Sequence, residues 1–78
     1  MAQMLFFGPA KSISKTSRIE ISAQDIREAL DVVINLYGPE LAKLISCSRV
    51  WLNGNEVDWS TQVTQSDEIA IIPPTSGG

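Results

Sequence analysis

The sequence predicts an α+β fold in which a mixed sheet of four to five strands carries one main helix across one face. Three observations predict it. Short segments of alternating apolar and polar residues occur in both halves of the chain, one amphipathic helical pattern lies between them, and no repeat or linker divides the 78 residues. A chain of this length forms a single domain that buries only about 60–65% of its extended surface, so its core must be well packed.

The first two strands are expected to form an antiparallel hairpin. Residues 3–7, Gln-Met-Leu-Phe-Phe, have the composition of a strand that Gly8-Pro9 ends. Residues 18–21, Arg-Ile-Glu-Ile, alternate strictly, so every second side chain faces a core. The polar stretch between them, residues 11–17, predicts a solvated hairpin loop.

The helix is the clearest element of the sequence. Apolar residues recur at spacings of three and four and give one continuous apolar face. These residues are Ile26, Ala29, Leu30, Val33, Ile34 and Tyr37. Ser22 meets the requirements of an N-cap, with Asp25 three residues later as in a capping box. Gly38 and Pro39 end the helix.

After the helix the strand pattern returns. A short helical turn or apolar loop around residues 41–45 is expected to close one end of the core. Residues 48–52 alternate again, and Asn53-Gly54 indicates a tight turn before a short return strand at residues 56–57.

The last strand, residues 68–72, decides the topology. It follows a polar loop at residues 58–66 with inward anchors at Trp59 and Val63. If the first and last strands lie parallel in the middle of the sheet, the plan is the ubiquitin-like β-grasp. We then expect a β-grasp domain over residues 1–72 and a flexible tail over residues 73–78.

The sheet face away from the helix is also expected to be apolar. If Ile69 and Ile71 face the helix, the two-residue period of a strand turns their neighbours to the other side. The residues of that outer face are then Ala70, Ile72, Trp51 and one of Phe6 and Phe7. Such a patch on a small domain favours a docking surface. The alternative is that the loop at residues 58–66 folds over it.

The composition excludes several kinds of site. Histidine is absent, so catalytic triads and zinc-type ligand patterns are impossible and no metal site is expected. The net charge of −3 without a basic cluster argues against nucleic acid, and no apolar run approaches the ~20 residues of a membrane span. Neither nucleic acid nor membrane is therefore an expected partner.

Cys47 is the only cysteine, which fits a reducing compartment, and without a secretory signal we expect the cytosol. Cys47 could relay sulfur, but a single cysteine at the start of a strand is more often a small buried apolar residue.

The last six residues, Pro-Pro-Thr-Ser-Gly-Gly, are the most distinctive stretch. Consecutive prolines favour an extended path, and glycines without a Cβ fit where only bare backbone passes. They would present the carboxylate of Gly78 at the end of a thin arm. Any catalysis must then use this backbone group inside a partner's site, although a frayed terminus without function is the alternative.

These features together resemble the molybdopterin synthase small subunits, a family of ubiquitin-like sulfur carriers. The resemblance covers nearly the whole chain. Its motifs are Leu5-Phe6-Phe7, Val50-Trp51-Leu52-Asn53-Gly54 and, most specifically, the run from Asp67 to Gly78. The chain departs from the family pattern at Lys11-Ser12, where many members have Arg-Glu, and at Gln65-Ser66, where a glycine is usual.

The resemblance implies the small sulfur-donor subunit of a two-subunit sulfurtransferase, with no catalytic side chains of its own. A ubiquitin-activating-like adenylyltransferase would consume ATP to adenylate Gly78, sulfur would replace AMP, and no cofactor would stay bound. The thiocarboxylate would enter the large catalytic subunit, in a heterotetramer of two large and two small subunits, and give its sulfur to cyclic pyranopterin monophosphate. Gly77 would be needed for insertion. The implied partner-binding residues are Phe7, Ile72, Pro73, Pro74, Thr75 and Ser76.

Three alternatives stay open. A carrier for thiamine synthesis or tRNA thiolation would share the fold, although the double proline favours the molybdopterin branch. A ubiquitin-like modifier would form isopeptide bonds to target lysines through the same activated glycine. An interaction module with an incidental Gly-Gly end would need neither sulfur loading nor isopeptide bonds.

Overall fold

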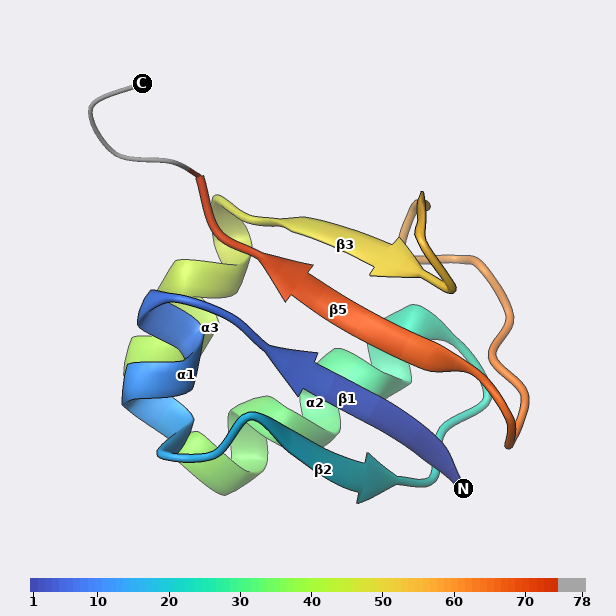
Figure 1. Cartoon of the computed structure of the whole chain (residues 1–78), viewed down its shortest axis with the longest axis horizontal. Coiled ribbons are helices and arrows are strands. Elements are labelled where there is room, and N and C mark those ends of the chain that lie inside the picture. Colours follow the sequence, from blue (N-terminus) through green and yellow to red (C-terminus); the bar gives the residue numbers. More distant parts are fainter. Residues whose placement is uncertain (75–78) are drawn as a thin grey trace.

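The sheet is built around its first and last strands. In the computed structural model, which describes residues 1–74, β5 (Glu68–Ile72) lies parallel to β1 (Ala2–Phe6) in the middle of the sheet (Figure 1). β2 (Arg18–Ile21) pairs antiparallel with β1, and β3 (Arg49–Leu52) pairs antiparallel with β5. The short β4 (Asn55–Glu56) completes the order β2-β1-β5-β3-β4. This is the β-grasp topology that the sequence predicts.

The core lies between this sheet and α2 (Ile26–Tyr37), which crosses one face. The alternation of the two central strands turns Met4, Phe6, Ile69 and Ile71 inward, and all four are fully buried. The ring of Phe6 meets Tyr37 of α2 edge to face, with the ring centroids 5.6 Å apart. The predicted apolar helix face is confirmed.

The start of α2 differs from the prediction. Ser22 is exposed and does not cap the helix, because the N-cap is Asp25, whose carboxylate accepts a hydrogen bond from the Glu28 N–H at 2.8 Å. The Glu28 carboxylate accepts in turn from the backbone N–H of Gln24 at 2.9 Å. The first turn also pairs with the distant loop, since the Ile26 N–H donates to the Thr61 carbonyl. The loop therefore fixes where the helix begins.

The expected loop at residues 11–17 is also wrong in part, because α1 (Pro9–Ser14) occupies its first half. Pro9 suits the first turn of a helix, where its missing N–H costs nothing. Ala10 and Ser14, four residues apart, are buried on one side of α1, while most of the other residues stay exposed. A helix this short, with a mostly polar sequence, resembles a solvated loop in sequence.

The predicted bounds of β2 (residues 18–21) and β5 (residues 68–72) are confirmed, whereas those of β1, β3 and β4 shift by one residue. The expected turn after Gly38 is a full helix, α3 (Pro39–Ser46), which packs against α1 and α2. The predicted tight turn is present, with positive φ at Asn53 (51°) and Gly54 (87°). None of the helices among residues 1–74 is long and apolar enough to cross a membrane.

Candidate functional site

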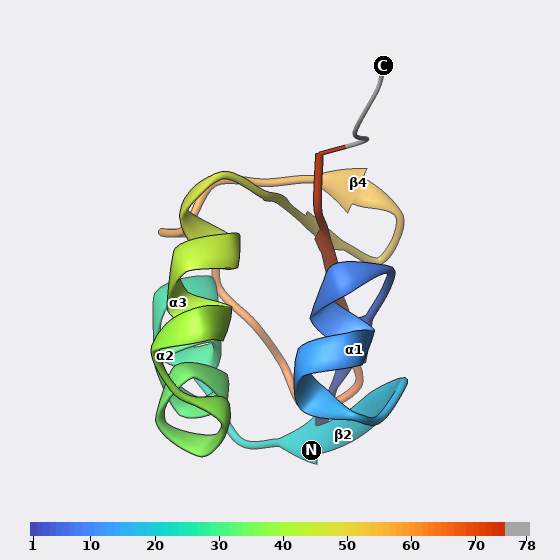
Figure 2. The same ribbon diagram turned by 90° about the vertical axis from the view of Figure 1, so that its left-hand side faces the viewer.

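The sheet face turned away from α2 and α3, here called the outer face, is open within residues 1–74. Figure 2 shows α2 and α3 together on one side of the sheet, with α1 apart from them in front of the end of the sheet. The loop at residues 58–66 does not cover the outer face. It is fixed on the helix side, because the Trp59 and Thr61 carbonyls accept hydrogen bonds from the first turn of α2, both at 3.0 Å. The outer face is therefore free for docking.

The strand register arranges the apolar residues of the outer face in rows. Leu5, Ala70 and Trp51 lie side by side across β1, β5 and β3. Ile72, at the end of β5, is opposite Arg49. All three large side chains, Leu5, Trp51 and Ile72, are half-buried.

Of the two phenylalanines, Phe7 is the exposed one. It follows β1 directly and is 47% exposed, whereas Phe6 belongs to the core. Phe7 and Leu5 line the same hollow of about 350 Å³. Leu5 and Phe7 therefore extend the apolar surface from the sheet to its end.

Trp51 contributes only apolar surface to the outer face. Its indole Nε1 is buried and has no hydrogen-bond partner among residues 1–74. An unpaired buried N–H costs about 1–3 kcal/mol. The indole is therefore held in place by packing and not by a hydrogen bond.

The chain leaves the sheet from the end of its middle strand. Pro73 and Pro74 follow Ile72 and, with Cys47 and Arg49, line a hollow of about 360 Å³. The predicted partner-binding residues Ile72, Pro73 and Pro74 thus lie together at one end of the outer face. The predicted site residues Thr75, Ser76, Gly77 and Gly78 lie outside the described residues.

The hollow beside Phe7 has a basic rim. Lys11 of α1 and Arg18 of β2 line it, and both side chains are exposed. Gly8 lies at its edge with φ of 53°, a conformation that favours glycine, at the sharp change of direction between β1 and α1. The sequence analysis does not predict basic side chains beside the outer face.

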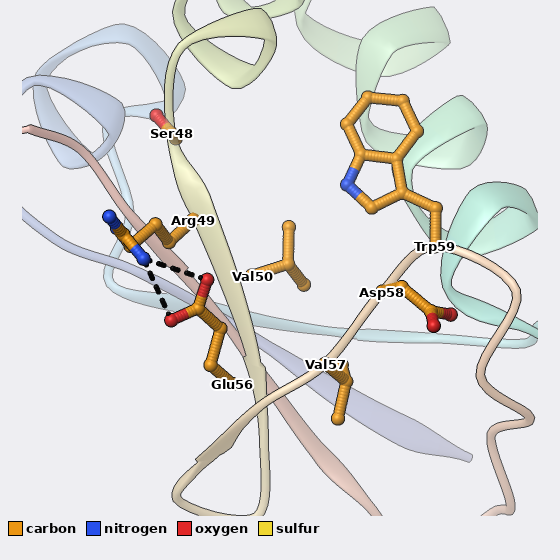
Figure 3. A pocket seen from close by; sticks show the side chains of 7 residues that line it. All are labelled: Ser48, Arg49, Val50, Glu56, Val57, Asp58 and Trp59. Atoms are coloured by element: carbon orange, nitrogen blue, oxygen red, sulfur yellow. Dashed lines mark hydrogen bonds and ion pairs between the residues drawn. The ribbon is translucent and has the colours of Figure 1, made fainter.

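A further hollow lies along β3 (Figure 3). It measures about 710 Å³ and is lined by Trp59, Val50 and Val57 on the core side of β3, with Arg49 and Glu56 on the other side. Arg49 pairs with both carboxylate oxygens of Glu56 at 3.0 Å. Both side chains are exposed, so this ion pair contributes under about 1 kcal/mol.

The other polar side chains of this hollow have local partners. The Ser48 hydroxyl donates to the Leu44 carbonyl at 2.7 Å, and the Asp58 carboxylate accepts from the Ser60 hydroxyl at 2.6 Å.

Two carboxylates have lowered pKa values, and both stabilise turns. Hydrogen bonds from the backbone N–H of Thr64 at 2.7 Å and from the Asn53 side chain at 2.9 Å lower the pKa of Asp67. The hydroxyl and backbone N–H of Ser60 lower the pKa of Asp58. Asp67 precedes β5 and lies at the opposite end of that strand from Pro73.

Cys47 is exposed, which corrects the expectation that it is a buried apolar residue. It follows α3 directly, and its thiol donates to the Leu44 carbonyl at 3.3 Å. Residues 1–74 contain no group of three acidic, cysteine or histidine side chains that could hold a metal ion.

A family model described as the ThiS family matches residues 4–78, which is nearly the whole chain and includes its Gly-Gly end. The chain belongs to the ThiS family. The resemblance to ubiquitin-like sulfur carriers is thereby confirmed at the level of the family. No curated protein matches the chain.

Solved structures show the same fold. A structure of the small archaeal modifier protein SAMP1 from Methanosarcina acetivorans is similar with a TM-score of 0.89 and 23% identity, over 99% of this chain and 95% of that one. The BexX/CysO complex of Amycolatopsis orientalis gives a TM-score of 0.85 at 17% identity, over all of both chains. The complex of subunits 1 and 2 of molybdopterin-converting factor from Helicobacter pylori 26695 gives 0.72 at 28% identity, covering 99% and 97%.

This ThiS-family chain is therefore a sulfur carrier or a ubiquitin-like modifier. Sequence reasoning found the outer-face residues but missed Lys11 and Arg18 beside them. Both residues are visibly charged in the sequence. That they lie together beside Phe7 becomes apparent only when α1 and β2 are placed against the end of β1.

Proposed function

We propose that this ThiS-family chain is the sulfur carrier subunit of a molybdopterin synthase. The observation that supports this best is the open apolar outer face at the point where the chain leaves the middle strand β5 toward its Gly-Gly end. The 28% identity to a chain in a complex of the two molybdopterin-converting factor subunits favours this branch of the family. The double proline before the last four residues favours it as well.

The chemistry begins at the carboxylate of Gly78. One carboxylate oxygen attacks the α-phosphorus of ATP in an adenylyltransferase, pyrophosphate leaves, and an acyl adenylate forms. A persulfide on a donor cysteine then attacks the acyl carbon and AMP leaves, which gives an acyl disulfide. A second thiol attacks the donor sulfur and breaks the S–S bond, so that the thiocarboxylate is released and the two thiols are left as a disulfide. The thiocarboxylate transfers its sulfur to cyclic pyranopterin monophosphate, and two transfers build the dithiolene. Because the reaction proceeds through activated intermediates, one difficult step is replaced by several steps with lower barriers.

The chain itself contributes delivery and not acid–base catalysis. It has no histidine, so the partner enzymes must supply the proton-transfer groups. Gly77 and Gly78 present no side chain to a narrow entrance. Pro73 and Pro74 restrict the chain before binding, which reduces the conformational entropy lost when the tail is ordered.

The partners of this proposal are two proteins that use the same tail in turn. The adenylyltransferase activates Gly78, and the large synthase subunit receives the sulfur, in a heterotetramer of two large and two small subunits. Both must leave room for Phe7 and Ile72, which flank the origin of the tail. No permanently bound cofactor is required, because ATP acts only at the activation step.

The intact mass of the chain tests this function. After incubation with ATP, a sulfur donor and the adenylyltransferase of the same organism, we expect a gain of about 16 Da, the difference between sulfur and oxygen, mapped to Gly78. A variant with one residue added after Gly78 is the matched control and should gain no mass, with an unchanged circular dichroism spectrum.

The same experiment separates the alternatives. Sulfur transfer from the loaded chain to cyclic pyranopterin monophosphate by the large subunit supports the molybdopterin branch. Loading without that transfer would indicate another sulfur pathway, and accumulation of lysine conjugates would indicate a modifier. An unchanged mass under all conditions would contradict the carrier function.

A further inference from the structure

The charged side chains of this protein are separated along its long axis. Figure 1 shows α1, α3 and the starts of β2 and β3 at the end where β5 finishes, here called the tail end. With the loop that holds Lys15, these segments carry five of the six cations and one acid, Glu40, and a second acid, Glu56, is paired with Arg49; together they give a side-chain charge of +3. The five cations are Lys11, Lys15, Arg18, Lys43 and Arg49.

The opposite end, where β1 and β5 begin, is acidic. It carries five of the nine acids and one cation, Arg27, a side-chain charge of −4. The five acids are Glu20, Asp25, Glu28, Asp67 and Glu68. Asp31, in the middle of α2, and Asp58, which lines one hollow with Arg49, belong to neither end and complete the net charge of −3.

Several acids outside the tail end have local roles in the fold. Asp25 and Glu28 cap α2, Asp58 accepts hydrogen bonds within its own turn, and Asp67 accepts one from the backbone of Thr64. At the tail end, Arg49 is paired with Glu56, and Arg18 donates a long hydrogen bond of 3.5 Å to the Gln3 side chain. The lysine side chains there have no hydrogen bond or ion pair among residues 1–74.

The cations flank the apolar end of the outer face. Lys11 and Arg18 share a hollow with Phe7 and Leu5 on one side. Arg49 shares the next hollow with Ile72 and the two prolines on the other side. A partner that takes the tail must therefore approach an apolar centre with Lys11 and Arg18 on one side and the Arg49–Glu56 ion pair on the other.

A partner at the tail end experiences that local charge and not the net charge. The molecule is 34 Å long, and the Debye length at physiological salt is about 8 Å. The acids of the far end are therefore largely screened from a protein that docks around Ile72. An overall acidic chain consequently presents a cationic contact surface.

We propose that the adenylyltransferase surrounds the entrance for the tail with acidic side chains, and that Lys11 and Arg18 pair with them so that the chain docks with its tail toward the entrance. This inference rests on the proposed function and adds the chemistry of the partner surface. Complementary charge chiefly raises the association rate and fixes orientation. The apolar centre formed by Leu5, Phe7 and Ile72 favours a protein partner over a nucleic acid, whose backbone would need a continuous basic track.

The test compares two arginines at opposite ends of the molecule; Arg18 lies near Gln3, and Arg27 lies over the Trp59 ring, 5.4 Å from its centroid. Arg18→Glu at the tail end and Arg27→Glu at the far end change the net charge equally, and both side chains are exposed. The probe is the adenylyltransferase of the same organism, and the readout is the association rate constant by stopped-flow fluorescence. We expect Arg18→Glu to slow association by about three- to tenfold and Arg27→Glu to have little effect.

Salt and a second variant complete the test. Raising the salt from about 0.1 to 1 M, where the Debye length falls from about 10 to about 3 Å, should remove most of the difference between wild type and Arg18→Glu. Lys11→Glu, on another element, should give the same effect if Arg18→Glu fails to fold.

The outcomes are distinct. Equal association rates for the two glutamate variants, or faster association of Arg18→Glu than of wild type, would overturn the proposed acidic entrance. The proposed function would still stand in that case if the wild-type chain is adenylated. Tighter binding of wild type to single-stranded RNA than to the enzyme would also overturn it. Failure of every chain, wild type included, to be adenylated would instead remove the proposed function and this inference with it.

Discussion

Ile71 and Ile72 are neighbours in β5, yet they belong to opposite surfaces of the protein. Ile71 is fully buried beneath the helices, and its Cα partner on β3 is the buried Val50. Ile72 is half-buried on the outer face, and its Cα partner is the exposed Arg49. The two side chains have the same volume, so substitutions at these positions separate stability from binding.

We predict that Ile72→Lys weakens binding to the large synthase subunit by about tenfold or more, because a charge would replace a central apolar contact. Its free energy of unfolding should change much less. Ile71→Ala is the contrasting variant and should lose about 2–5 kcal/mol of stability. Calorimetric titration and urea unfolding measure the two quantities. A large fall in stability with unchanged affinity for Ile72→Lys would place Ile72 in the core.

Asp67 makes the stability of the fold depend on pH. Hydrogen bonds in the folded state lower its pKa below the ordinary value of 3.8. A carboxyl group with a lowered folded pKa stabilises the protein above its unfolded pKa, and this contribution is lost as the pH falls through the folded value. The contribution is therefore complete at neutral pH and disappears below about pH 4.

Asp67→Asn should accordingly lower the melting temperature at pH 7 and flatten its decline between about pH 5 and pH 2. Thermal unfolding by circular dichroism across that range measures the effect. Asp31→Asn, an exposed acid of α2 without a side-chain hydrogen bond among residues 1–74, is the matched control. Equal pH profiles for the two variants would mean that the Asn53 and Thr64 hydrogen bonds contribute nothing.

At the scale of elements, α2 shows where local sequence is insufficient. Ser22 and Asp25 are both good N-cap residues, and the residues between them do not decide which is used. The decision comes from the loop more than thirty residues later, whose carbonyl groups at Trp59 and Thr61 accept the first free N–H groups of the helix. The apolar face, in contrast, was predictable because its spacing is a property of the helix alone.

The capping assignment is directly testable. Asp25→Ala should lower the free energy of unfolding by about 0.5–2 kcal/mol, since the Glu28 N–H loses its acceptor. Ser22→Ala should change it by no more than about 0.5 kcal/mol. Urea unfolding of both variants measures the difference, and the reverse order would restore Ser22 as the cap.

At the scale of the whole molecule, strand order and the choice of exposed face could be predicted, because alternation assigns each strand residue to a side. The charge separation could not. Lys11, Arg18, Lys43 and Arg49 are scattered over four elements, and only the folded topology brings those elements to one end. The partner contacts at Thr75 to Gly78 stay predictions, as does the identity of the pathway.

The central position of β5 has a consequence for how the protein is made. Until residues 68–72 are synthesised, the β1–β2 hairpin and the β3–β4 hairpin are two separate pieces, each with an unpaired inner edge. The sheet closes only when β5 enters between them, and the Gly-Gly end follows directly in the sequence. An enzyme that docks on the closed sheet before taking the end would therefore modify folded chains alone, so recognition of the outer face would also act as proofreading against nascent and misfolded copies.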